Sequence, residues 1–190
     1  MIGKLIAVLL ITTLYTLVRY VVFGHVSPVH VPVYLVNKSI SMASVVLLSF
    51  AAFSYSRQNT DRLRVWGTAS LHCACIHVLL SLSILSSGYY PKFFGAEKMN
   101  LPGEVAVLLG ILAIYCYWLS HYVRTVPMRR GVFQVFASLF VAGHLTVMGF
   151  QGWLNVAKWH GGLPPISLVS LVFAVASLML FSRPRGEPSR

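Results

Sequence analysis

Residues 132–150 read VFQVFASLFVAGHLTVMGF and contain no Asp, Glu, Lys or Arg. The stretch is apolar on every side instead of at every second position, which favours a helix over a membrane strand. A membrane-spanning helix needs roughly 20 such residues, with about 17 to 25 usual. We therefore predict an all-α membrane protein, a six-transmembrane-helix bundle, because five more apolar stretches follow this pattern: residues 5–23, 39–55, 65–85, 105–121 and 166–181.

The composition agrees with an integral membrane protein, since 57% of the residues are hydrophobic and only 10% are charged. A soluble domain carries roughly 25% charged residues. No polar stretch is long enough to fold separately, so we predict one transmembrane domain over residues 1–182 and a basic cytoplasmic tail over residues 183–190. The net charge of +11 would suggest nucleic acid in a soluble protein. Here the basic residues cluster at helix ends, which favours the lipid bilayer as partner and no nucleic acid.

The basic residues also predict the orientation, because positive charges collect on the cytoplasmic side. With both termini cytoplasmic, ten of the fifteen Lys and Arg face the cytoplasm and five lie near the other face. Both termini lie on the same side of the membrane only if the number of membrane-spanning helices is even. We therefore expect a multi-pass protein of the cell inner (plasma) membrane. The ten cytoplasmic residues are Lys4, Arg57, Arg62, Arg64, Arg124, Arg129, Arg130, Arg183, Arg185 and Arg190.

Two histidines inside apolar stretches are predicted to lie at equal depth. His77 is 77 − 64 = 13 residues after Arg64, and His144 is 144 − 130 = 14 residues after Arg130. At 1.5 Å per residue, both imidazoles lie roughly 20 Å from the inner boundary. Two imidazoles at one depth on two helices can clamp a planar cofactor between them. Bis-histidine heme is the natural candidate, because neutral imidazole binds iron strongly.

Structural roles for the histidines remain open beside this hypothesis, because an intramembrane histidine often only hydrogen-bonds a neighbouring helix. His72 is five residues from His77, so it lies about 140° around the same helix and on another face. His25, His30 and His160 lie near the predicted outer face and could form a metal or substrate site. Three loop histidines without carboxylates fit no standard metal motif, however.

Other residues are interpreted as structural. The cysteines Cys73, Cys75 and Cys116 lie inside apolar stretches and are expected to pack without a disulfide. Aromatic residues near the predicted outer face are expected to form an interfacial belt instead of a cofactor site. They are Tyr89, Tyr90, Phe93, Phe94 and Trp153. No phosphate-binding glycine loop is present, and the connecting loops are too short for a nucleotide-binding fold.

Several short motifs occur in a fixed order: Asn37-Lys38, Arg64-Val-Trp-Gly67 followed by His72 and His77, Tyr89-Tyr-Pro-Lys-Phe-Phe94, His144 followed by Trp153-Leu-Asn155, and Leu163-Pro-Pro-Ile-Ser167. Together they resemble the ferric reductase-like transmembrane family, in particular its small bacterial members. That family includes NADPH oxidases, ferric reductases and the heme-bearing membrane subunit of bacterial methionine sulfoxide reductase systems. The resemblance covers about Val33 to Phe181.

The resemblance implies one heme b in the outer half of the bundle, with His77 and His144 as axial ligands of the iron and His72 as a weaker candidate contact. It implies a membrane cytochrome b-type electron-transfer subunit that passes electrons to an acceptor at the outer face. Since no flavin or nicotinamide domain is present, such a ferric reductase-like oxidoreductase component would need a redox partner protein, with a flavin, or a membrane quinol. The alternative is a non-redox membrane protein, an assembly factor or a small-molecule carrier.

Overall fold

The structure, a computed structural model, describes residues 1–26, 31–95, 98–122 and 127–183, without the side chains of 127–130. Helices dominate the described residues, and no strand occurs among them beyond one isolated bridge between Phe94 and Met99. The α-helices are α1 (Ile2–Leu17), α2 (Val31–Ser56), α3 (Thr60–Ser83), α4 (Leu101–Tyr122), α5 (Pro127–Trp153) and α6 (Ile166–Phe181). Short turns are η1 (Val18–Val22), η2 (Pro91–Phe93), η3 (Val156–Lys158) and η4 (His160–Gly162).

Within the described residues, six helical segments of 21 to 26 residues are long and apolar enough to cross a membrane. This confirms the predicted six-helix, all-α membrane fold; the orientation of the termini stays a prediction. The stretch 39–55 was drawn too short, because α2 begins at Val31. The polar residues Asn37 and Lys38 precede the predicted stretch but lie inside α2, and side chains of the bundle interior are their partners. The six segments make the chain a multi-pass membrane protein.

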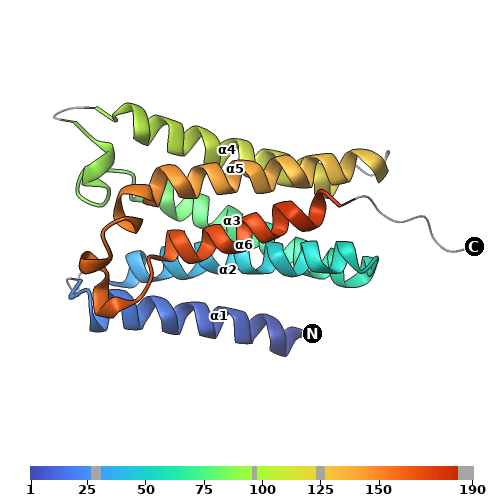
Figure 1. Cartoon of the computed structure of the whole chain (residues 1–190), viewed down its shortest axis with the longest axis horizontal. Coiled ribbons are helices and arrows are strands. Elements are labelled where there is room, and N and C mark those ends of the chain that lie inside the picture. Colours follow the sequence, from blue (N-terminus) through green and yellow to red (C-terminus); the bar gives the residue numbers. More distant parts are fainter. Residues whose placement is uncertain (27–30, 96–97, 123–126, 184–190) are drawn as a thin grey trace, which may run out of the picture.

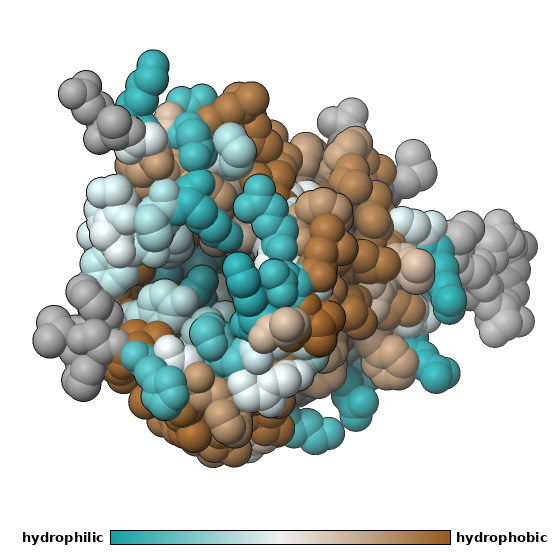
Figure 2. Space-filling model, turned by 60° about the vertical axis from the view of Figure 1, so that its left-hand side comes forward, coloured by the Kyte–Doolittle hydropathy of each residue, from teal (hydrophilic) through white to brown (hydrophobic). Residues whose placement is uncertain are grey.

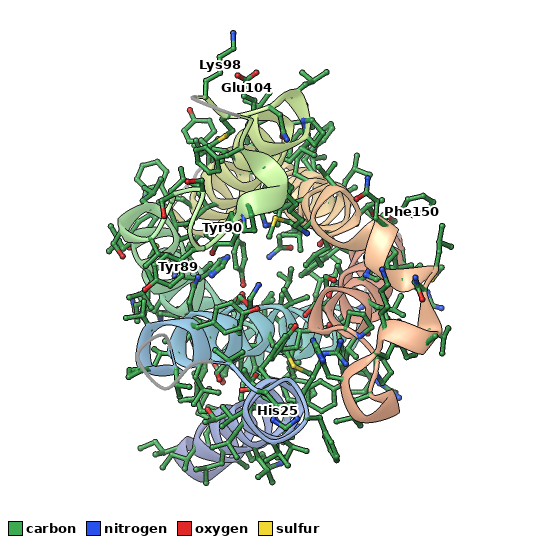
Figure 3. All side chains as sticks on the ribbon, turned by 90° about the vertical axis from the view of Figure 1, so that its left-hand side faces the viewer. His25, Tyr89, Tyr90, Lys98, Glu104 and Phe150 are labelled. Carbon is green, nitrogen blue, oxygen red and sulfur yellow. The ribbon has the colours of Figure 1, made fainter. Side chains whose placement is uncertain are left out.

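Five helices form a closed ring in which each contacts the next: α2, α3, α4, α5, α6 and back to α2. Helix α1 lies outside this ring and packs on α2 (Figures 1 and 3). The contact between α3 and α4 is the slightest in the ring. The ring therefore encloses an interior to which α2 to α6 can all contribute side chains.

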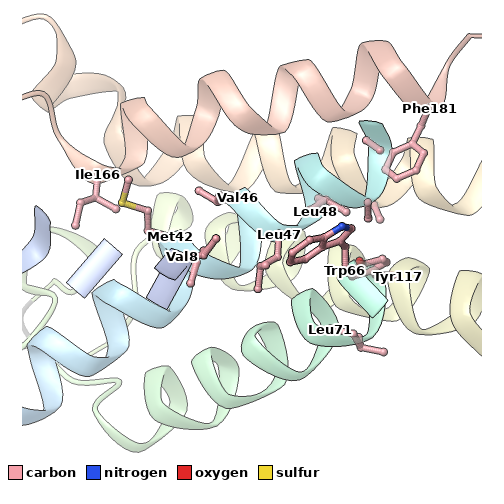
Figure 4. Close-up of a cluster of buried hydrophobic side chains, with 14 residues drawn as sticks. Val8, Met42, Val46, Leu47, Leu48, Trp66, Leu71, Tyr117, Ile166 and Phe181 are labelled. Carbon is pink, nitrogen blue, oxygen red and sulfur yellow. The ribbon is translucent and has the colours of Figure 1, made fainter. Parts of the chain in front are cut away.

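The core runs along α2, whose Ala43, Leu47 and Ala51 are fully buried. Around them pack Trp66 of α3 and further buried side chains from the other helices (Figure 4). Apolar side chains also cover the outside of the bundle, while many serines are buried inside. Such an inverted distribution suits a bilayer, because lipid tails are as apolar as the side chains that face them.

The two ends of the bundle differ, and we name them after the predicted orientation. The outer end holds the ends of α3 and α5 and the starts of α2, α4 and α6. The inner end holds the start of α1 and the turn between α2 and α3. Figure 2 shows a hollow at the outer end with hydrophilic side chains around it, next to a hydrophobic flank.

Candidate functional site

The imidazole of His77 is fixed by α2. Its Nδ1 lies 2.6 Å from the amide oxygen of Asn37, a residue that is almost fully buried. The Asn37 amide nitrogen donates to the hydroxyls of Ser81 and Tyr90, each at 3.2 Å. Since the amide oxygen can only accept, Nδ1 of His77 carries the proton. The Nε2 atom therefore keeps its lone pair.

The imidazole of His144 is fixed in the same way by α4. Its Nδ1 lies 2.7 Å from the carbonyl oxygen of Ala106 and must donate to it. Gly110, one turn further along α4, leaves room for the ring: a Cβ there would lie 3.3 Å from Nδ1 of His144. Nε2 again keeps its lone pair. A hydrogen bond from Nδ1 to a neighbouring oxygen fixes the tautomer of histidines that bind metals or protons through Nε2.

The structure brings the two predicted histidines together inside the ring. His77 and His144 lie close enough to interact electrostatically. Both rings are only half-buried although they belong to the bundle interior. The space beside them lies toward the outer end of the bundle, where Figure 2 shows a hollow among hydrophilic side chains. We call this space the histidine chamber.

Two lysines join the histidine chamber. The Lys38 ammonium lies 5.3 Å from the ring centre of Tyr34 and 5.9 Å from that of Tyr90, and its charge acts on both imidazoles. The Lys92 ammonium donates to the carbonyl of Met148 on α5. Loss of water and the nearby charge of Lys38 lower the pKa of Lys92 to about 8.

A short strap over the outer end, residues 90–94, holds Tyr90 and Lys92 in place. Asn100 donates to the Lys92 carbonyl at 2.9 Å and accepts from the Gly103 amide at 3.0 Å. Gly103 is required here, because a Cβ would lie 2.9 Å from the carbonyl oxygen of Phe93. Tyr90 consequently points into the space that the five helices enclose (Figure 3). Burial raises the pKa of the Tyr90 hydroxyl.

No carboxylate reaches the histidine chamber from the described part of the chain. Asp61 lies in the first turn of α3, at the inner end. Glu104 is exposed on α4 and points away from the interior, as does Lys98 (Figure 3). The site thus combines two ammonium groups, two imidazoles and the hydroxyl of Tyr90, which the Asn37 amide holds in place. Such a set attracts anions, while the two Nε2 atoms can take protons or bind a metal ion.

The remaining predicted residues do not join this site. His72 is exposed on the flank of α3, so the structure does not bring it to the pair. At the outer end, His25 and His160 lie near each other and near Arg19, while His30 falls outside the described residues. No cluster of three His, Cys, Asp or Glu residues able to hold a metal occurs in the described ranges. Cys73, Cys75 and Cys116 are free and half-buried, as expected.

Sequence reasoning missed three contributors. It assigned Lys38 and Lys92 only to the outer face and Tyr90 to the interfacial belt. The signal for Lys38 was its place beside Asn37, four residues after Tyr34, in a segment apolar enough to continue the helix. The inward turn of Tyr90 and Lys92 depends on the strap over the outer end, which no local pattern predicts.

Comparison with known proteins gives a distant similarity. ATP synthase subunit a from Rhodopseudomonas palustris (strain BisB18) is 26% identical over 114 residues. The match covers 57% of this chain and 44% of that protein, so the chain spans less than half of the relative's length. No family model matches the chain. No solved structure matches it either.

These findings overturn the predicted family and its function. The similarity leads to a different family from the ferric reductase-like one, and no family model supports the resemblance. The assignment to the ferric reductase-like family is wrong, and so is the electron-transfer function of a membrane cytochrome b. The motifs misled because aromatic residues at interfaces, proline at helix starts and basic residues at helix ends occur in many membrane proteins.

Proposed function

We propose that this membrane protein binds an anion, free or as part of a small molecule, in the histidine chamber. One observation carries the proposal: no described carboxylate joins a group of four basic side chains at the outer end, which lie within electrostatic reach of one another. They are Lys38, Lys92, His77 and His144. Removing a charge from water without a partner is costly, and an anionic ligand offsets that cost.

Each group has a defined part in the proposed binding. Lys38 and Lys92 supply positive charge from two sides, one from inside α2 and one from the strap. Tyr90 supplies a neutral hydroxyl near His77, and Asn37 holds both side chains in place, because its amide donates to Tyr90 and accepts from His77. Each imidazole keeps its Nε2 lone pair, which can take a proton and donate to the anion or bind a metal ion that accompanies it. The opening at the outer end provides the entrance (Figure 2).

Thermal unfolding of the purified chain with sulfate as probe tests the proposal. A ligand that binds only the folded state raises the melting temperature. We expect sulfate to stabilise the wild type beyond chloride at equal ionic strength, and Lys38→Gln or Lys92→Gln to weaken sulfate binding about tenfold. Lys98→Gln is the matched control, because it removes one exposed cation from the same end.

Sulfate also stabilises proteins generally, by exclusion from their surface. That general effect is the same in every variant, so only the part lost in Lys38→Gln and Lys92→Gln reports the site. Equal losses in all three variants, or stabilisation by sulfate and by chloride that Lys38→Gln and Lys92→Gln leave unchanged, would show that the chamber does not bind anions.

The predicted cofactor, one heme b held by His77 and His144, stays a prediction without an electron-transfer role. The residues present fit such a group, because each imidazole keeps the Nε2 lone pair that binds iron and the nearby lysines can receive the heme carboxylates. An absorption spectrum of the purified chain tests this prediction directly. A Soret band lost in His77→Ala and in His144→Ala would support heme, and a colourless protein with sulfate-dependent stability would leave the anion site alone.

The similarity to ATP synthase subunit a also changes the proposed partner. A redox partner, a flavin or a quinol was predicted only as the electron donor of a cytochrome, and the cytochrome function is wrong, so these partners have no support. We propose instead that the chain works in the bacterial inner membrane as part of a protein complex. Crosslinking in native membranes followed by gel filtration tests this, and a chain that elutes alone under mild extraction contradicts it.

A further inference from the structure

A second site lies at the inner end, between α1, α2 and α3. There a cavity of about 340 Å³ is lined by Lys4 of α1, Phe50 and Phe53 of α2, and Arg62 and Trp66 of α3, among others. It exists because α1 packs on α2 and has little contact with α3. The cavity is separate from the histidine chamber, because no residue that lines it belongs to that chamber.

The walls of this inner cavity are aromatic. The rings of Phe50 and Trp66 meet edge to face, with centres 5.4 Å apart. Trp66 is buried, whereas Phe50 and Phe53 are exposed on the flank of the bundle. An exposed aromatic surface on a membrane helix faces lipid. The cavity therefore opens toward the bilayer rather than toward water alone.

The rim of the inner cavity is basic. Lys4 and Arg62 are exposed, and no carboxylate is among the lining residues. Arg62 lies near the start of α3 at Thr60, while Trp66 is four residues, or about 6 Å, further along. Positive charge thus stands at the helix ends and the aromatic floor lies one turn deeper. This order matches a lipid, whose phosphate lies at the surface and whose acyl chains lie below it.

We propose that the inner cavity binds an anionic phospholipid of the adjacent leaflet, with Lys4 and Arg62 on its phosphate and the aromatic residues against its acyl chains. Basic pockets between membrane helices on the cytoplasmic side are suited to anionic headgroups. A soluble anion would leave the aromatic walls without a partner. The site is independent of the proposed anion chamber, since it shares no residue with it.

Tryptophan fluorescence of the full chain in vesicles tests the proposal, because Trp66 lines the cavity. Phosphatidylglycerol with brominated chains quenches a tryptophan that it touches. We expect brominated phosphatidylglycerol to quench more than brominated phosphatidylcholine at equal mole fraction, and Trp66→Phe to remove this excess. The double variant Lys4→Gln/Arg62→Gln should weaken the preference for the anionic lipid about 30-fold, from two lost cations at the surface.

The double variant Arg64→Gln/Arg183→Gln is the matched control. It removes two exposed cations from the same end but none from the cavity. Lipids retained in native mass spectra supply a second measurement if a variant folds poorly in vesicles. Equal losses in both double variants would reduce the effect to general surface charge and overturn the site. Equal quenching by the two lipids in the wild type would overturn it as well.

Discussion

The two proposed sites, one at each end of the bundle, each have two cations, but in opposite surroundings. At the outer end, Lys38 and Lys92 lie with imidazoles, an amide and a hydroxyl around an interior hollow. At the inner end, Lys4 and Arg62 stand on the rim of an aromatic cavity on the flank. The comparison indicates that the side chains around the cations, more than the charge itself, determine which ligand a site binds. Polar neighbours suit a small anion, and aromatic neighbours suit a lipid.

The largest effect is expected from Asn37→Leu, which alters only the site at the outer end. The change removes the acceptor for His77 Nδ1 and both amide donors, so Nδ1 keeps only its longer contact with the Ser81 hydroxyl, at 3.4 Å. We expect a loss of about 3 kcal/mol in stability, since each unpaired buried group costs about 1–3 kcal/mol. Thermal unfolding measures the loss, and the sulfate effect should disappear with it.

Ser39→Ala is the control for Asn37→Leu. Ser39 is equally buried, but its hydroxyl bonds only the Leu35 carbonyl of its own helix, at 2.8 Å. Its loss should cost less than about 1 kcal/mol. The lipid preference at the inner end should survive both changes. If Asn37→Leu abolished that preference too, the two ends would not be independent.

The second largest effect is expected from Gly103→Ala, which crowds the backbone of the strap. The added Cβ would lie 2.8 Å from the Cβ of Phe93 and 2.9 Å from its carbonyl oxygen, so backbone has to move. We expect a loss of about 2 kcal/mol, as overpacking usually costs about 1–3 kcal/mol. Sulfate binding should weaken as well, because the strap carries Tyr90 and Lys92. Gly152→Ala, which meets open space, should leave sulfate binding unchanged.

The sequence predicted the scaffold of this site better than its contents. The six apolar stretches and the equal depth of His77 and His144 follow from local composition and helical rise, which the chain alone determines. The places of Lys38 and Tyr90 depend on α2 extending to Val31 and on the strap turning inward. Both depend on tertiary contacts between segments far apart in the chain, so no local pattern encodes them.

The family assignment failed for a related reason. Short motifs at helix ends report the membrane environment as much as they report ancestry. Trp153 illustrates this, because its indole donates to Ser167 of α6 at 2.9 Å and so packs one helix end against another. A residue with such a structural role does not distinguish one membrane family from another. Residues that meet inside the ring discriminate better.

A change of pH should separate the two ends without any mutation. Lys92 has a pKa lowered to about 8, so it loses its proton as the pH rises through that value. Sulfate stabilisation should therefore be full below pH 8 and decline above it, with a midpoint raised somewhat by the bound anion. Lys92 is not among the residues that line the inner cavity, so loss of its proton should leave the lipid preference unchanged.

Lys92→Gln controls for the other titratable groups of the chamber, namely Lys38, Tyr90 and the two imidazoles. Its residual sulfate effect should decline less near pH 8 than the sulfate effect of the wild type. A decline of unchanged size in Lys92→Gln would assign the titration to one of those groups. A parallel decline of the lipid preference would remove the distinction between the two ends.

The smallest effect is expected from Arg57→Gln, which probes how closely the inner site is defined. The Arg57 guanidinium lies 5.3 Å from the ring centre of Phe53, yet Arg57 is not among the residues that line the cavity. A cation–π contact at an exposed position is worth about 0.5–1 kcal/mol, and its loss lets the Phe53 ring turn. We expect the preference for phosphatidylglycerol to fall only about threefold, an order of magnitude less than in Lys4→Gln/Arg62→Gln. Competition between brominated and plain lipids in the quenching assay resolves this difference. A loss as large as that of the double variant would place the lipid phosphate on Arg57, at the turn between α2 and α3, and would move the site away from the cavity.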